Sequence, residues 1–267
     1  MSRHFVSTWD QTMSRIYVFA ASKMEVRPVL ELSRPNGGAG LPALGATLSV
    51  GPNDLTPIVS GMGPQLARRT AAEALRAWIN QDGLRRAAEG RPDAVLVIGL
   101  CGGLTQSLPQ LRLVLYTNCL SSAGGPPLDC APAVTSRLAQ LLGSGGMTCE
   151  RVVGITSPRI AVTRADRLAL AASGAAVVDM ESYEFLAAAA RASVRAAVLR
   201  VVSDSVDSNL PNFNDALNAD GALDGRKALR VALGSPVQTF RLVAQNKRAM
   251  RELAEALTIV LRADLMG

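Results

Sequence analysis

The sequence predicts one α/β domain built on a mostly parallel, in part mixed, β-sheet. Short apolar runs of strand type alternate along the chain with segments of helical spacing, which is the order of elements in α/β proteins. The composition, 48% hydrophobic and 19% charged over 267 residues, is that of a globular protein with a large core. We therefore expect a flexible leader at residues 1–14 and a single domain at residues 15–267, with no linker that divides it.

The predicted strands are short runs of apolar and β-branched residues bounded by turn residues. In chain order they span residues 16–21, 46–50, 56–59, 93–98, 112–116 and 151–155, and two acid-bearing runs, 175–179 and 198–203. Gly51-Pro52-Asn53-Asp54 is expected as the turn between the second and third strands, and residues 99–104 as a glycine-rich turn after the fourth.

The predicted helices carry small and apolar residues near helical spacing. In chain order they span residues 23–32, 64–79, 134–142, 164–173, 182–191, 222–233 and 236–261. Pro28 lies within the first of these ranges and is tolerated only early in a helix, because its ring removes a hydrogen bond. Segments 34–45, 121–132 and 205–219 are predicted as loops.

Two carboxylates, Glu181 and Asp204, each follow an apolar run of strand type, and residues 182–191 supply one crossover helix between them. We expect the two strands to be parallel neighbours that bring both acids to one sheet edge, where α/β enzymes place their sites. Each acid also has a structural explanation. Glu181 could stabilise a helix dipole, and Asp204 could be an ordinary cap or turn residue.

The composition excludes several kinds of site. The single histidine, His4, lies in the expected leader, so a Ser-His-Asp device or a His-based metal centre is nearly excluded. The four cysteines form no CxxC pair, which favours reduced thiols over zinc binding or disulfides. We therefore expect no metal site.

The charge pattern bears on partners and location. A net charge of +6 scattered along helices favours solvated helix faces, with an anionic ligand or surface as the alternative. Aromatic content of 4% and the lack of a basic run argue against a nucleic-acid partner. A cytoplasmic protein is expected, because residues 1–15 hold no apolar signal core and no run approaches the ~20 residues of a membrane span.

Glycine-rich turns are expected at two strand ends, at Gly61 and Gly63 and at Gly99, Gly102 and Gly103. Glycine lets backbone amides approach an anion or a sugar closely, although tight structural turns would have the same composition. Beside such turns, a carboxylate at a strand end can accept hydrogen bonds from a ribose diol, and an aspartic acid in a dry pocket can protonate a departing purine.

Together these motifs resemble the nucleoside phosphorylase superfamily. They follow its order: Gly61-Met62-Gly63, then Gly102-Gly103-Leu104, then Val178-Asp179-Met180-Glu181, then Arg200-Val201-Val202-Ser203-Asp204. The resemblance covers about residues 16–261 and implies a three-layer α/β/α fold with a mixed, mostly parallel central sheet.

A closer resemblance is to the hopanoid-associated phosphorylase branch of that superfamily, which acts on adenosylhopane. The residues that carry it are Gly61-Met62-Gly63-Pro64, Val178 to Ser182, Ser203 to Asp207 with Leu210-Pro211, Asp220-Gly221 and Ser235 to Gln238.

The resemblance implies site roles. Glu181 would hold the ribose hydroxyls, and Asp204 would be the acid at the purine. Substrate binding would involve Met180, Gly102, Gly103 and Ser203. Anion binding would involve Gly63 and Arg27.

The chain departs from the family at two places. Ala20-Ala21-Ser22 stands where phosphorylases commonly place a phosphate-binding glycine, and Leu100-Cys101 replaces the Ser-Ala of many relatives. The methylthioadenosine nucleosidase branch has a water-activating acid near Glu25. Arg27 lies close to that position, and because arginine suits phosphate we expect phosphorolysis.

The expected function is therefore cleavage of the N-glycosidic bond of an adenosine-type nucleoside, with inorganic phosphate as co-substrate and no cofactor. The alternatives are hydrolysis, of the methylthioadenosine/S-adenosylhomocysteine or futalosine type, and a nucleoside-binding module without catalysis. A homo-oligomer is implied by the resemblance. A membrane contact is conceivable through Arg241, Lys247, Arg248 and Arg251, with a solvated helix face as the alternative.

Overall fold

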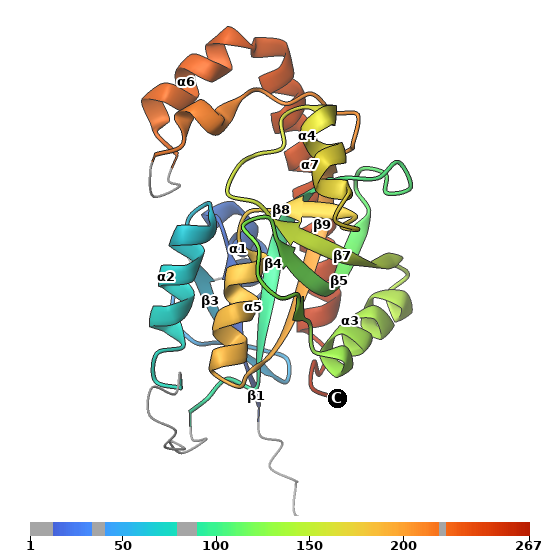
Figure 1. The fold of residues 1–267 in the computed structure, drawn as a ribbon. Coiled ribbons are helices and arrows are strands. Elements are labelled where there is room, and N and C mark those ends of the chain that lie inside the picture. Colours follow the sequence, from blue (N-terminus) through green and yellow to red (C-terminus); the bar gives the residue numbers. More distant parts are fainter. Residues whose placement is uncertain (1–12, 34–40, 79–89, 219–222) are drawn as a thin grey trace, which may run out of the picture.

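The computed structural model describes residues 13–33, 41–78, 90–218 and 223–267, and its centre is a nine-stranded mixed sheet (Figure 1). The strands, in chain order, are β1 Ser14–Ala20, β2 Leu48–Val50, β3 Asn53–Val59, β4 Ala94–Gly103, β5 Leu113–Ser121, β6 Leu128–Asp129, β7 Cys149–Thr156, β8 Val177–Asp179 and β9 Arg195–Asp204. Five strand pairings are parallel and four antiparallel, as expected for a mixed sheet.

Five of the strands close into a ring. The sheet runs β2-β3-β1-β4-β8-β7-β5-β6, and β9 pairs with both β4 and β5. The pairings β4-β8-β7-β5-β9-β4 therefore leave no free edge between these strands. β4 joins the ring to the rest of the sheet. Along one edge, its first half pairs with β1, and its last residues, Gly102 and Gly103, pair with β8.

Helices cover both faces of the sheet and give the three layers expected. In chain order they are α1 Lys23–Leu32, α2 Pro64–Ala74, α3 Pro132–Ser144, α4 Arg164–Ala171, α5 Ser182–Arg191, α6 Gly225–Gly234 and α7 Pro236–Leu261, with a short 3-10 helix, η1, at Phe213–Ala216.

Side chains alternate between two apolar cores along β4. Leu96 and Ile98 belong to the core that α1, α3 and α7 cover, whereas Val95 and Val97 belong to the core under α2 and α5. This alternation follows from the two-residue period of a strand. The alternation therefore determines which of the two cores each side chain of β4 enters, up to the residues that line the site.

The expectation that the two acid-bearing strands are parallel neighbours is wrong. β9 runs parallel to β4, while β8 runs antiparallel to it and pairs at Gly102 and Gly103 on the other edge. A bulge between Cys101 and Gly102 shifts the register there. The two acids therefore reach one region from strands on opposite sides of β4.

The predicted turn at residues 99–104 is also wrong, because β4 continues to Gly103 through backbone pairing with β9 and β8. Other differences are smaller. β5 extends to Ser121, beyond the predicted 112–116, and the predicted loop 121–132 contains β6, because these residues pair with β7 and with each other. β3 begins at Asn53, so the preceding turn is only Gly51-Pro52, and α2 ends at Ala74 rather than near residue 79.

The first helix has the predicted bounds but contains Pro28 in its interior. The hydrogen bond that Pro28 cannot donate would go to the carbonyl of Met24, in the first turn of the helix, so only one bond near its start is lost. A capping box between Ser22 and Glu25 fixes the start of the helix.

Some expectations lie at the limits of the described residues. β1 begins at Ser14, the last position of the expected leader, while residues 1–12, His4 among them, lie outside the described part of the chain. The start of the helix expected at 222–233 also lies outside it, and α6 begins at Gly225. Within the described ranges, no helix is both long enough and apolar enough to cross a bilayer.

A substitution at Gly99 can test how closely β4 packs against Arg200 and Glu25. The φ of Gly99 is +147°, and a Cβ added there would lie 2.5 Å from Arg200 Nη1 and 2.5 Å from Glu25 Oε1. We predict that Gly99→Ala lowers the free energy of unfolding by about 1–3 kcal/mol through overpacking, measured by urea denaturation. Gly143→Ala is the matched control, since a Cβ there meets nothing within 4 Å, and it should be neutral or stabilising. Equal stability of the two variants would contradict the packing described here.

Candidate active site

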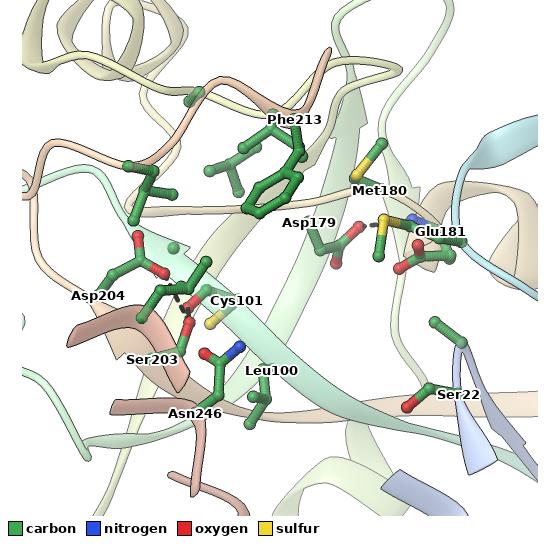
Figure 2. A pocket seen from close by; sticks show the side chains of 18 of the residues that line it. Ser22, Leu100, Cys101, Asp179, Met180, Glu181, Ser203, Asp204, Phe213 and Asn246 are labelled. Atoms are coloured by element: carbon green, nitrogen blue, oxygen red, sulfur yellow. Dashed lines mark hydrogen bonds between the residues drawn. The ribbon is translucent and has the colours of Figure 1, made fainter. Parts of the chain in front are cut away.

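A cavity of about 390 Å³ lies where β4, β8 and β9 end, in the size range of small-molecule sites. Figure 2 shows Asp204 and Ser203 at one end and Glu181 with Met180 at the other. The structure therefore brings both predicted acids into one cavity, together with Met180, Ser203 and Gly102.

Asp179 has a structural role at the Glu181 end of the cavity: its carboxylate positions the backbone around Glu181. Its Oδ1 accepts hydrogen bonds from the amides of Glu181 and Ser182, both at 3.0 Å, and from Thr156 Oγ1 at 2.7 Å. Its Oδ2 accepts from the Tyr116 hydroxyl at 2.9 Å. Burial alone would raise the pKa of Asp179, but Arg200 and these hydrogen bonds outweigh it and the pKa is lowered. Asp179 is thus an anion that fixes the start of α5.

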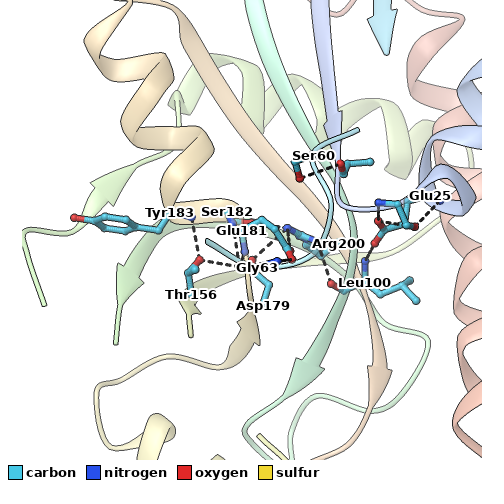
Figure 3. A network of polar contacts seen from close by, with 12 residues as sticks. Glu25, Ser60, Gly63, Leu100, Thr156, Asp179, Glu181, Ser182, Tyr183 and Arg200 are labelled. Carbon is cyan, nitrogen blue, oxygen red and sulfur yellow. Dashed lines mark hydrogen bonds and ion pairs between the residues drawn. The ribbon is translucent and has the colours of Figure 1, made fainter. Parts of the chain in front are cut away.

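Arg200 is the counter-charge of this end, and its side chain is only 1% exposed. Its Nη2 lies 3.6 Å from Asp179 Oδ2 and 3.6 Å from Glu181 Oε2, and donates to Ser182 Oγ at 2.9 Å. Its Nη1 donates to the Leu100 carbonyl at 3.1 Å. Burial opposes the charge, but the two carboxylates outweigh it and the pKa of Arg200 is raised. The network is drawn in Figure 3.

Glu181 is held by Arg200 and by the amide of Gly63, which donates to Glu181 Oε1 at 3.0 Å. Burial raises the pKa of Glu181 to about 7; Arg200 and the Gly63 amide oppose the rise, whereas Asp179 and Glu25 add to it. Gly63 precedes α2 directly, so its predicted anion-binding amide binds an anion of the chain itself.

Glu25 completes this end of the cavity. It is buried, and three donors serve its carboxylate: the Ser22 amide at 2.8 Å, the Ser22 hydroxyl at 3.0 Å and the Leu100 amide at 3.2 Å. An ionised carboxylate accepts about four hydrogen bonds. One acceptor position therefore remains for a ligand or a water molecule, and Glu25 is among the residues that line the cavity.

Asp204 forms the opposite end with a partner that the sequence did not indicate. Its Oδ2 lies 2.5 Å from Arg167 Nη2 in an ion pair whose side chains are 7% and 1% exposed. Its Oδ1 accepts from the Ser203 hydroxyl at 2.6 Å. The ion pair is not aligned as a hydrogen bond, and Oδ2 has no hydrogen-bond donor among the described residues. A ligand atom can therefore still use it.

Two predicted glycines support that pair. A Cβ on Gly102 would lie 2.9 Å from Arg167 Nη1 and 3.0 Å from Asp204 Oδ2, so glycine is needed for the close approach. Gly103 does not line the cavity; its carbonyl accepts from Arg167 Nη1 at 3.1 Å. The structure therefore gives Gly103 a contact with Arg167 in place of the predicted contact with substrate.

The predicted anion-binding role of Arg27 does not fit its position. Arg27 pairs with Glu31 at 2.7 Å on the outside of α1, and its side chain is 65% exposed. The two residues are one helical turn apart, the spacing of an ordinary surface pair. Arg27 is not among the residues that line the cavity.

Most of the remaining wall is apolar. Residues from α1, from the segment before α2, from the loop after β9 and from α7 contribute to it. They are Met24, Met62, Leu210, Pro211, Phe213, Leu223, Leu242 and Met250. Met24 and Leu223 are also exposed, so the apolar wall reaches the surface.

The family is decided by the sequence itself: residues 15–223 match the model of the phosphorylase superfamily. The chain belongs to the phosphorylase superfamily. A sequence comparison with curated proteins finds no match.

Solved structures of the phosphorylase superfamily share the fold at low identity. The 5'-methylthioadenosine/S-adenosylhomocysteine nucleosidase of Neisseria meningitidis, in complex with methylthio-immucillin-A, has a TM-score of 0.69 and 14% identity over 94% of this chain and 99% of that one. The corresponding nucleosidase of Helicobacter pylori has a TM-score of 0.66 and 14% identity over 92% and 96%. The futalosine hydrolase of Helicobacter pylori has 0.65 and 13% over 93% and 97%.

Arg167 and Glu25 are among the cavity residues that the sequence did not assign to the site, and their sequence signals differ. Arg167 comes directly after the capping box that Thr163 and Asp166 form at the start of α4. The other residues of this helix are largely exposed, so no pattern marks Arg167 as buried. Glu25 has two signals: the family resemblance places it near the water-activating acid of the nucleosidase branch, and the spacing Ser22-x-x-Glu25 predicts a helix cap.

The raised pKa of Glu181 predicts a pH-dependent stability. In the unfolded chain this group titrates near 4.5, so its stabilising contribution is complete below that pH and is lost as the pH rises through about 7. We expect Glu181→Gln to remove up to roughly 3 kcal/mol of this loss, measured by urea unfolding at pH 5 to 8. Glu31→Gln, on an exposed side chain, is the control. Parallel stability curves for the wild type and Glu181→Gln would refute the assignment.

The ion pair at the other end predicts a double-mutant result. Arg167→Met leaves Asp204 buried and uncompensated, so we expect a loss of about 3–5 kcal/mol in unfolding free energy. Adding Asp204→Asn should recover a large part of that loss. Arg164→Met, on the exposed side of α4, provides the comparison and should change stability little. Additive effects of the two site substitutions would show that the pair is not coupled.

Proposed function

We propose that this member of the phosphorylase superfamily is a nucleosidase, which hydrolyses the N-glycosidic bond of an adenosine-type nucleoside. The observation that carries the proposal is the division of one cavity into two charged ends. Glu181 and Glu25 lie around Arg200 at one end, and Asp204 lies with Arg167 at the other.

At the first end, the carboxylate of Glu181 accepts hydrogen bonds from the ribose diol and stabilises positive charge on the sugar ring. The free acceptor position of Glu25 holds a water molecule below the ring. As the water oxygen bonds to the anomeric carbon, Glu25 takes the proton that the water loses.

At the second end, the purine leaves with the electrons of the glycosidic bond and takes up a proton at a ring nitrogen. Asp204 takes up a proton from solvent when the substrate binds and donates it from Oδ2 to that nitrogen as the bond breaks; Glu25 returns the proton of the attacking water to solvent, so both carboxylates are restored. Arg167 and Ser203 are positioning residues, since each contacts Asp204 directly. The reaction so written needs neither a metal nor an organic cofactor.

Two observations favour water over phosphate as the nucleophile. Arg27, the arginine expected for phosphate, is paired with Glu31 on the surface. Around Arg200 the cavity holds three carboxylates, those of Glu25, Asp179 and Glu181, and such a group of carboxylates repels a dianion. The nucleosidases and the futalosine hydrolase that share the fold are named for hydrolysis.

The apolar wall supports a substrate with a large apolar 5' substituent. Met24, Met62 and Leu223 carry this wall from the cavity to the surface, so a substituent longer than the cavity can leave through it. Adenosylhopane, which the sequence resemblance implies, has this character. Each buried methylene is worth about 0.8 kcal/mol, or roughly fourfold in affinity.

The deciding experiment measures adenine release from 5'-alkylthioadenosines of increasing chain length, with and without phosphate. We expect release without phosphate, free sugar as the second product, and kcat/KM rising with chain length. A strict phosphate requirement with a sugar phosphate as product would establish phosphorolysis instead. Tight binding without adenine release would make the chain a binding module.

Substitutions then test the assigned residues. We predict that Asp204→Asn and Glu25→Gln each lower kcat by about 10²-fold or more, because each removes a proton acceptor or donor from the transition state. Glu31→Gln and Arg27→Ala are the matched controls on α1 and should leave kcat unchanged. Full turnover by Asp204→Asn would sink the site assignment, whereas a phosphate-dependent defect in Arg27→Ala would restore the phosphorylase hypothesis.

A further inference from the structure

A basic and apolar arm projects from the body of the protein. We define the α6–α7 arm as residues 225–251, which comprise α6 and the first part of α7; in Figure 1 α6 lies at the far end of the molecule from β1. This arm contains seven lysines and arginines and no aspartate or glutamate. The seven are Arg226, Lys227, Arg230, Arg241, Lys247, Arg248 and Arg251, and all are exposed.

The same arm exposes large apolar side chains. Leu229 and Leu233 lie four residues apart on α6 and therefore on one face, and Leu233 is 71% exposed. Val237, Phe240 and Val243 continue this surface along α7, with Phe240 75% exposed. No residue of α6 is buried, so this helix contributes nothing to either core. The apolar side chains are not explained by the fold of the single chain.

The charges of the arm are also unpartnered. Among the residues that the structure describes, none of the seven cations lies within 4 Å of a carboxylate. A second copy seated arm against arm would bring seven cations against seven others, and the acids that flank the arm, Asp224 and Glu252, are too few to balance them, which disfavours self-association there. The occupant must therefore supply both anionic groups and apolar material.

We propose that the α6–α7 arm docks on the surface of an anionic lipid bilayer. Lipid phosphates would pair with the cations, while Leu233, Phe240 and their apolar neighbours enter the boundary between headgroups and acyl chains. The arm would lie in the plane of the interface.

The arm adjoins the cavity, which suggests a route for the substrate; this step rests on the proposed function. Leu223, which precedes α6, and Leu242 of α7 line the cavity, so the apolar wall of the cavity is continuous with the arm. A nucleoside with an apolar 5' group could enter from the bilayer without exposing that group to water.

The test is co-sedimentation of the full chain with vesicles of phosphatidylcholine alone and with 30% phosphatidylglycerol, at low and high salt. We expect binding only to the anionic vesicles, weakened by salt. The variant Arg226→Gln/Lys227→Gln/Arg230→Gln should bind on the order of 100-fold more weakly. Leu233→Glu/Phe240→Glu should bind more weakly at every salt concentration.

A matched control removes three exposed cations elsewhere, in Arg69→Gln/Arg76→Gln/Arg191→Gln, and should bind vesicles as the wild type does. Adenine release from a short-chain soluble substrate should be unchanged in the arm variants, which separates this test from the test of the reaction. No binding to anionic vesicles at low salt, or an equal loss in the control, overturns the proposal. So does a concentration-dependent dimer that Phe240→Glu disperses while vesicle binding is absent.

Discussion

The site depends on one buried positive charge. Arg200 shares its guanidinium between Asp179 and Glu181, and its other hydrogen bonds go to Ser182 and the carbonyl of Leu100. Removing Arg200 would leave two buried carboxylates without their counter-charge, and breaking a buried pair in this way typically costs about 3–5 kcal/mol. The start of α5, the end of β8 and the middle of β4 are therefore held together electrostatically as well as by apolar packing.

The ring of strands explains why one cavity can have two chemically different ends. β8 and β9 pair with opposite edges of β4, so Glu181 and Asp204 approach the ligand from different sides. A flat sheet with parallel neighbours would place the two carboxylates side by side, where they would compete for one role. Here the closed ring keeps them apart, and each acid has its own arginine.

The sequence predicted the fold class, the alternation of elements and the two acids, because strand and helix periods and strand-end carboxylates are local signals. It could not predict the course of β4 beyond Gly99, since glycines read as a turn until the partners on both edges are known. Arg167 was missed because its burial results from long-range packing beside Asp204, and Arg27 was misplaced because spacing alone does not say which face of α1 meets the cavity.

The backbone and the side chain of Leu100 have separate roles, and this separation bears on how the residues of the site can be substituted in evolution. The Leu100 carbonyl accepts from Arg200 and its amide donates to Glu25, so the backbone alone bridges the cation to the carboxylate. The side chain meanwhile lines the cavity and takes no part in that bridge. Selectivity can therefore drift at this position while the charge network stays intact, which separates the evolution of substrate choice from that of the catalytic framework.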